Sequence, residues 1–416
     1  MSKQANETPI RVIRWLFYAF VLSLPFETVV EGVMEPTTIL GALLFAGTLL
    51  QPGIFLRWPP KGFWCFIIYL YFYATLSLLE PSAYRTLSFF NVYLLTQLTL
   101  LGWIGFCLMR DPKTAERALL VFAAGCVVLA VLQITGIAAR GVEADRAAIV
   151  RVTAFGFHPN NLARILMLGL LAILGVAMAR AKSLARPLLL TSPLVILLCV
   201  ALVQTGSRGG LLALGAGVMT LVLRRGTLVM KILNGAGLLL LLGVFLFAAM
   251  QSDIMRSRFE ETLEDGDLAR RDLIYPTAFQ MFQEKPWLGW GPVNSTFELG
   301  MRLGHPEEET KNPHNIILYG LVSTGVFGTI PLIVGLGFAS ANAWRTRNGP
   351  HGILPLALVV SVLIANMSGL WLFNKLHWLV MAYAMATIYQ VARQKSEAPV
   401  ESAERADFGE RELVTI

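Results

Sequence analysis

Twelve apolar stretches, most of them near the length of a membrane-spanning helix, constrain the fold of this chain more than any other feature. A helix needs about 20 largely apolar residues to cross a bilayer. Hydrophobic residues form 55% of the chain and charged residues 15%, with a mean hydropathy of +0.62. We therefore predict an all-α polytopic membrane protein with about 12 transmembrane helices. The stretches run over residues 10–28, 36–55, 62–79, 89–109, 115–135, 163–180, 187–204, 209–223, 229–250, 314–341, 352–369 and 373–392.

Lysine and arginine are concentrated in alternate loops, which predicts how the chain is oriented. By the positive-inside rule, both termini lie in the cytoplasm and the long loop 251–313 lies outside. The net charge of +7 is accounted for by the cytoplasmic anchors, so we expect membrane lipids and no nucleic acid as partners. The basic loops contain Arg11 and Arg14, Arg57 and Lys61, Arg110, Lys113 and Arg117, Arg180, Lys182 and Arg186, Arg224, Arg225 and Lys231, and Arg345 and Arg347.

The polarity pattern divides the chain into four regions. Within the external loop, Ile274, Ala278, Met281 and Phe282 recur at the three- and four-residue spacing of one helix face, so this loop is predicted to be partly helical. The span cores carry almost no ionisable residues, which argues against an ion-coupled transporter. The regions are residues 1–250 with nine spans, the loop 251–313, residues 314–392 with three spans, and a tail 393–416 predicted to be disordered.

Two outward-facing segments place arginines next to predicted helix starts. Arg151 and Arg164 flank a Pro-Asn-Asn turn that contains Asn160, and arginine on this face runs against the positive-inside rule. Arg208 follows Thr-Gly-Ser and precedes two glycines at the start of a span. Free backbone N–H groups and an arginine fork at a helix N-terminus suit a phosphate. The alternatives are simple helix caps and a snorkelling interfacial arginine.

The external loop supplies two further segments. One carries Arg270, Arg271 and Tyr275 ahead of a Pro-Trp-Leu-Gly-Trp-Gly-Pro turn, and its alternative role is a surface helix with solvated charges. The other carries His314 and Asn315, which we place at the start of the tenth span. The positive end of a helix lowers the pKa of a histidine, and a neutral histidine can act as a general base. The alternative is a histidine that only caps the helix.

Acidic residues in the same loop offer a weaker signal. Asp265 and Asp267 have the spacing of a metal-binding carboxylate pair, although this Asp-Gly-Asp sequence also fits an ordinary turn. Residues 307–309 are three glutamates just before His314. They could orient the imidazole, or they form a solvated acidic run.

Together these segments resemble the O-antigen ligase and O-antigen polymerase superfamily of bacterial inner-membrane glycosyltransferases. Two positions depart from the family pattern: Ala154 stands where a glycine is usual, and Tyr275 stands where a tryptophan is usual. The second mismatch leaves the choice between Arg270 and Arg271 open. The matching motifs are Arg-x-x-Gly-x-x-x-x-Pro-Asn-x-x-Ala at 151–163, Ser-Arg-Gly-Gly at 207–210, Arg-x-x-x-Trp at 271–275, Pro-x-x-Gly-x-Gly at 286–291 and His-Asn-x-x-Leu at 314–318.

The resemblance implies a fold and a chemistry. The fold would be of the glycosyltransferase type C kind, with loop 251–313 in the periplasm. The donor would be a glycan on undecaprenyl diphosphate and the acceptor lipid A–core, with inversion and without a metal or cofactor. By the same resemblance, His314 would be the general base. Arg208 and Arg271 would hold the diphosphate, with Arg270, Arg151 and Arg164 as further candidates and Asn160, Asn315 and Tyr275 in support.

Three other functions stay open from the sequence. An O-antigen polymerase shares the motifs but commonly has two sizeable external loops, whereas here only 251–313 is long. A protein O-oligosaccharyltransferase tends to be longer after the histidine motif. A lipid-linked glycan transporter would need polar groups along a path through the bilayer.

Overall fold

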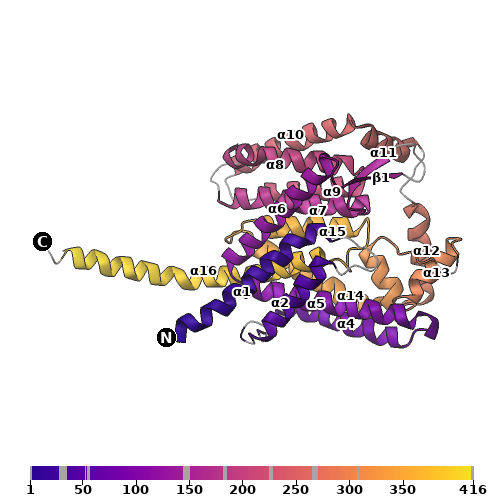
Figure 1. The fold of residues 1–416 in the computed structure, drawn as a ribbon, viewed down its shortest axis with the longest axis horizontal. Helices are drawn as coiled ribbons and strands as arrows, with labels where there is room; N and C mark the ends of the chain where they lie inside the picture. Colours follow the sequence, from indigo (N-terminus) through magenta and orange to yellow (C-terminus); the bar gives the residue numbers. More distant parts are fainter. Residues whose placement is uncertain are drawn as a thin grey trace.

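The computed structural model describes residues 2–27, 35–51, 53, 57–143, 150–180, 185–223, 228–264, 270–306 and 309–413. The protein is a bundle of long helices (Figure 1). Both termini lie at one end of the bundle, and α11, β1, α12 and α13 lie at the other end. This arrangement agrees with the predicted placement of both termini on one side of the membrane.

Each predicted apolar stretch coincides with a helix, which confirms the mainly helical membrane architecture. Among the described residues, five helices are long and apolar enough to cross a membrane, and five shorter ones are apolar. That all twelve cross the bilayer stays a prediction. The twelve helices are α1 Ser2–Ser23, α2 Pro36–Leu49, α4 Lys61–Leu78, α5 Arg85–Met109, α6 Pro112–Ile134, α7 Pro159–Arg180, α8 Ala185–Gln204, α9 Arg208–Val222, α10 Leu228–Met250, α14 Ile316–Arg345, α15 Leu354–Asn366 and α16 Lys375–Leu413.

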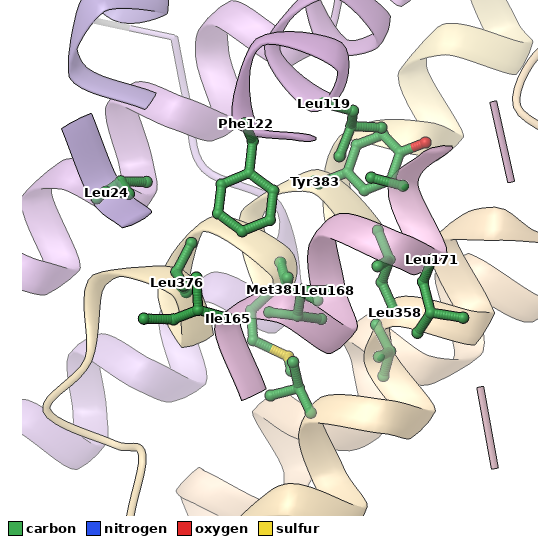
Figure 2. Close-up of a cluster of buried hydrophobic side chains, with 14 of the residues drawn as sticks. Leu24, Leu119, Phe122, Ile165, Leu168, Leu171, Leu358, Leu376, Met381 and Tyr383 are labelled. Carbon is green, nitrogen blue, oxygen red and sulfur yellow. The ribbon is translucent and has the colours of Figure 1, made fainter. Parts of the chain in front are cut away.

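Helix α7 is the centre of the bundle. Its most apolar window is 89% buried, against 39–56% for the other long apolar helices. Figure 2 shows how its leucine and isoleucine side chains interlock with neighbouring helices. Because α7 is surrounded by protein, polar residues in its first turn face other residues and not lipid. The labelled side chains come from the short 3-10 helix η1 at Leu24–Phe26 (Leu24), α6 (Leu119, Phe122), α7 (Ile165, Leu168, Leu171), α15 (Leu358) and α16 (Leu376, Met381, Tyr383).

The loop 251–313 is partly helical, as predicted. It contains α11 at Asp253–Glu264, α12 at Arg271–Glu284 and α13 at Asn294–Arg302. Helix α12 buries Ile274, Ala278 and Met281, with Phe282 packed at the margin of the same cluster. The three- and four-residue spacing therefore predicted the packed face of this helix correctly.

A buried carboxylate attaches this loop to the bundle. Glu80, just after α4, accepts hydrogen bonds from the backbone N–H groups of Val293 at 2.7 Å and Asn294 at 2.9 Å. It also accepts a hydrogen bond from the hydroxyl of Ser88, which follows the 3-10 helix η2 at Ser82–Tyr84. These bonds fix the N-terminal end of α13 against α4 and α5.

The Pro-x-x-Gly-x-Gly turn packs directly against α14. The backbone N–H of Trp290 donates to the Val322 carbonyl at 2.8 Å. Gly289 has a φ of +70°, and a Cβ there would lie 2.6 Å from the same carbonyl oxygen. Only glycine permits both this left-handed conformation and this close approach.

Two features differ from the prediction. Residues 139–143 and 150–154 form antiparallel strands β1 Ala139–Glu143 and β2 Val150–Ala154, where we expected only a loop before the sixth span. Five-residue strands give too short a periodic signal to be recognised. Helix α16 also extends past the end of the predicted span at 392, as far as Leu413, and the disorder expected for the tail 393–416 stays a prediction. Alanine, glutamate and arginine favour helix, and extending a packed helix needs no new nucleation.

Candidate active site

Arg151 connects the first two predicted segments. It lies on β2 and is only 8% exposed. Its Nε donates to the Thr205 carbonyl at 2.7 Å, and one terminal nitrogen donates to Asn160 Oδ1 at 2.9 Å. Strand β2 thereby joins the start of α7 to the turn between α8 and α9. Arg151 and Asn160 therefore hold these three segments together.

Arg164 lies in the first turns of α7 and is 4% exposed. Its guanidinium donates to Asn161 Oδ1 at 3.3 Å and lies 5.5 Å from the centre of the Trp371 ring. Asn161 Oδ1 also accepts from Trp371 Nε1 at 3.3 Å. A Cβ at Gly369 would run into the guanidinium, so the glycine leaves room for it.

Arg208 begins α9, as predicted. Ser207 caps this helix, because its hydroxyl accepts from the Gly210 N–H at 3.2 Å. The following Gly209 packs against the loop after α15, where a Cβ would lie 2.5 Å from Ser368 Oγ. The Ser-Arg-Gly-Gly sequence thus places a helix N-terminus close to a second backbone segment.

Arg271 and Tyr275 lie one turn apart on α12 and contact the same loop. One terminal nitrogen of Arg271 donates to the Ser368 carbonyl at 2.8 Å, and Tyr275 Oη donates to the Met367 carbonyl at 2.7 Å. The buried Arg271 Nε has no hydrogen-bond acceptor within the described part of the chain. Arg270 differs: it is exposed and left-handed, with a φ of 60°. The geometry therefore favours Arg271 over Arg270.

These segments enclose a small polar pocket with about 340 Å³ of empty space. No described residue that lines it is acidic. Three guanidiniums that share a confined space repel one another unless an anion lies between them. The pocket therefore has the charge of an anion site. Its lining residues are Asn160, Arg164, Gly206, Ser207, Arg208, Gly209, Arg271 and Ser368.

His314 lies immediately before α14, and this corrects its predicted place in the first turn. The helix begins at Ile316, and Asn315 is the cap: its side-chain oxygen accepts from the N–H groups of Ile317 at 2.9 Å and Leu318 at 3.2 Å. His314 has a φ of 50°, which is uncommon for a residue with a side chain. Because Asn315 performs the capping, capping does not explain His314.

The surroundings of His314 keep its imidazole neutral. The residue stays exposed at the surface, yet neighbouring atoms displace water from the ring. This loss of hydration, followed by the positive charges of Arg271 and Arg164, lowers the pKa of His314 to about 4. The sequence pointed to the helix end as a cause of a lowered pKa but left the net shift of His314 open, and the causes here are desolvation and the arginines. The neighbouring Asn315 contacts Met367 Sδ at 3.7 Å, so His314 lies next to the loop that Arg271 and Tyr275 also contact.

Comparison with known proteins places part of this chain next to one family. Residues 193–333 match the family model described as O-antigen ligase. In this region the chain is similar to the O-antigen ligases. The matched region contains Arg208, Arg271 and His314, whereas Arg151 and Arg164 precede it. The resemblance inferred from the sequence motifs is confirmed.

One similar protein is itself named an O-antigen ligase. The chain is 29% identical over 251 residues to an "O-antigen ligase" of Pseudomonas aeruginosa. The match covers 58% of this chain and 57% of that protein. The chain thus matches little more than half the length of that relative. The match alone does not identify the donor or the acceptor of this chain.

The loop between α15 and α16 is a part of the candidate site that the sequence did not reveal. It supplies the carbonyls of Met367 and Ser368 and the ring of Trp371. The Asn366 side chain holds the loop in shape, because its oxygen accepts from the Trp371 N–H at 2.9 Å. A sequence does not show which backbone carbonyls will contact other residues. The polar residues Asn366 and Ser368, at the end of the apolar stretch 352–369, were the available signal.

The acidic residues of the loop do not form a metal centre within the described residues. Nowhere in that part of the chain do three or more histidine, cysteine or acidic side chains gather as metal ligands. The pair Asp265 and Asp267 lies outside the described residues, as do Glu307 and Glu308. Glu309 pairs with His305 at 3.0 Å and with Lys311 at 3.4 Å. We therefore do not propose that Glu309 orients the imidazole of His314.

Proposed function

We propose that this chain is a glycosyltransferase that moves a glycan from undecaprenyl diphosphate to lipid A–core, at the periplasmic face of a bacterial inner membrane. One observation carries the proposal: a neutral histidine lies beside a pocket lined by three arginines and no acidic residue among those described. The relationship to O-antigen ligases supports the reaction class.

Arg208 and Arg271 bind the donor diphosphate in this proposal. Arg208 adds its guanidinium to the free N–H groups of the α9 N-terminus, a favourable combination for phosphate oxygens. Arg271 presents an Nε that has no acceptor among the described residues. Arg164 closes the pocket from α7. Arg151 keeps β2 in place through Thr205 and Asn160.

His314 is the general base of the proposed reaction. The imidazole takes the proton of an acceptor hydroxyl, whose oxygen attacks the anomeric carbon of the donor sugar. The bond from that carbon to the diphosphate oxygen breaks in the same step, so the configuration inverts. The arginines stabilise the negative charge that grows on the leaving diphosphate. They supply the positive charge that a divalent metal would otherwise provide, so we propose a metal-independent reaction.

An apolar groove beside the pocket suits the lipid part of the donor. It holds about 1380 Å³ of empty space between α7, α8, α9 and α10. Its lining includes Leu170, Val200, Leu214 and Phe245, and it reaches Gln204, two residues before Gly206 of the pocket. A polyprenyl chain in this groove would direct its diphosphate towards the arginines.

The test is reconstitution of the purified protein in EDTA with glycan-bearing undecaprenyl diphosphate and lipid A–core. We expect glycan-bearing lipid A–core that depends on the acceptor. Longer lipid-linked glycan from the donor alone would replace the ligase proposal by the polymerase. Activity that returns only when a divalent metal is added would contradict the metal-independent mechanism.

A further inference from the structure

A second cluster of arginines lies far from the candidate active site along the helices. On α1, Arg11, Arg14, Trp15 and Tyr18 fall at spacings of three, four and seven residues, so they share one helix face. On α6, Arg117, Leu120 and Val121 repeat the same spacing. Each face carries arginine at its N-terminal end and aromatic or aliphatic residues further along.

The two faces meet in a groove with about 1080 Å³ of empty space, lined by these seven residues. Two contacts show that α1 and α6 run parallel. Arg14 lies 3.9 Å from Asp111, just before α6. Further along, a Cβ at Gly125 would lie 3.0 Å from the Leu22 carbonyl oxygen. The arginines of both helices are therefore at similar depth, and Tyr18, Leu120 and Val121 lie deeper in the bundle.

Two acidic residues, Asp111 and Glu116, lie close to the groove, and Asp111 also binds other groups. Asp111 caps α6 by accepting from the backbone N–H of Thr114 at 3.1 Å and its hydroxyl at 2.7 Å. It also lies 3.3 Å from Arg393, so its charge is shared. Glu116 is also on α6. The residues described as lining the groove include three arginines and no acidic residue, with Asp111 and Glu116 beside them.

We propose that this groove binds the head group of an anionic phospholipid in the cytoplasmic leaflet. The guanidiniums of Arg14 and Arg117 bind the phosphate, since arginine matches the geometry of phosphate oxygens. The acyl chains lie along Leu120 and Val121, and Trp15, which is 72% exposed, is at the interface level favoured by tryptophan. The leaflet follows from the orientation predicted by loop charges and not from the proposed transferase activity.

The test compares two doubly substituted full-length proteins in their affinity for phosphatidylglycerol and phosphatidylcholine, measured by native mass spectrometry. Arg14→Gln with Arg117→Gln removes two groove guanidiniums. Arg345→Gln with Arg347→Gln removes one arginine at the end of α14 and one just after it, on the same predicted side but outside the groove. A basic residue at an anionic membrane surface gives about a fivefold gain in affinity. We expect the first pair to lower phosphatidylglycerol binding by at least about tenfold, with binding of phosphatidylcholine unchanged.

The control pair should keep the preference for phosphatidylglycerol. An equal loss in both pairs would overturn the proposal, because it would indicate general surface charge. Displacement of the lipid by inorganic phosphate alone would also overturn it in favour of a small-anion site. If the double variant elutes as unfolded protein, Arg117→Gln alone replaces it, since Arg117 is exposed and its loss does not disturb the core.

Discussion

Arg271 donates to the backbone carbonyl of Ser368 at 2.8 Å, and this bond joins the loop 251–313 to the helix bundle at the candidate site. The two residues are 97 positions apart in the chain. The same loop after α15 also accepts from Tyr275 and packs its Trp371 ring against Arg164. The anion pocket is thus assembled by a backbone segment that has no charge of its own.

The neighbouring arginines on α12 offer a matched pair of variants. Arg271→Ala should reduce transfer at least about 100-fold, because a charge that stabilises the leaving group is removed. Arg271→Lys should recover only part of the loss, since an ammonium lacks the planar fork. Arg270→Ala should change the rate by less than about threefold, the effect expected of an exposed charge. Equal effects at both positions would contradict the assignment of Arg271, and steady-state kinetics at varied donor concentration provides the measurement.

Tyr275→Phe removes one hydroxyl and the hydrogen bond to the Met367 carbonyl. A hydrogen bond of this kind contributes about 0.5–1.5 kcal/mol. We expect donor affinity to fall by a comparable factor, about threefold to tenfold, because Arg271 is held less firmly. Gln280→Ala, on the exposed side of the same helix, is the control. Unchanged affinity in Tyr275→Phe, measured by direct donor binding, would remove the positioning role.

Gly369→Ala tests whether donor binding depends on the present position of the Arg164 guanidinium. The added Cβ would run into the guanidinium of Arg164, so this side chain or the loop must shift. We expect weaker donor binding in a protein that still folds. Gly337→Ala on α14 meets no atom within 4 Å and serves as the matched control. Full donor affinity in Gly369→Ala, with the fold checked by thermal unfolding in detergent, would argue against a role for Arg164.

Glu80→Ala tests how the loop 251–313 is attached. One carboxylate oxygen of Glu80 accepts the backbone hydrogen bonds of both Val293 and Asn294, and alanine has no oxygen to replace it. We expect a loss of about 1–3 kcal/mol in stability, seen as a lower unfolding temperature and faster proteolysis after α13. Glu260→Gln breaks only the exposed pair with Arg256, and its effect should stay below about 1 kcal/mol. Equal stability of both variants would show that Glu80 does not hold the loop.

The pH dependence of transfer follows from the lowered pKa of His314. In the donor-free protein this pKa is about 4, so the imidazole is already neutral at pH 7. The acid limb of kcat/KM for the donor should therefore lie near pH 4, the pKa of His314 in the donor-free protein. A bound diphosphate favours the protonated imidazole, so the limb of kcat should lie at higher pH. Identical limbs for kcat and kcat/KM would contradict the placement of diphosphate beside His314.

Folding stability carries a related signature. The folded protein holds His314 with a pKa below the unfolded value of 6.5, so the unfolded chain binds the proton first. The stability that comes from the neutral imidazole is present above the unfolded value and is lost as the pH falls towards about 4. His314→Gln should remove this dependence. An unchanged slope of unfolding temperature against pH in the variant would contradict the lowered pKa.

The sequence predicted helices better than it predicted the contacts between them. Apolar length and spacing were sufficient to locate α7 and the packed face of α12, because burial imposes a regular pattern. Arg208 and His314 were identified by their position near helix starts. The sequence could not separate Arg270 from Arg271, because the difference depends on which one reaches Ser368. It also could not reveal Trp371 as a neighbour of Arg164, since two residues more than 200 positions apart meet only through packing of α7, α15 and α16.

The most direct test of the account is the rate of glycan transfer by His314→Ala in EDTA, with donor binding measured on the same preparation. We expect donor binding within a few-fold of the unsubstituted protein, because the arginines are unchanged. Transfer should fall at least about 100-fold, the usual contribution of a general base. A variant that binds donor and still transfers glycan at the original rate would contradict the central role of His314.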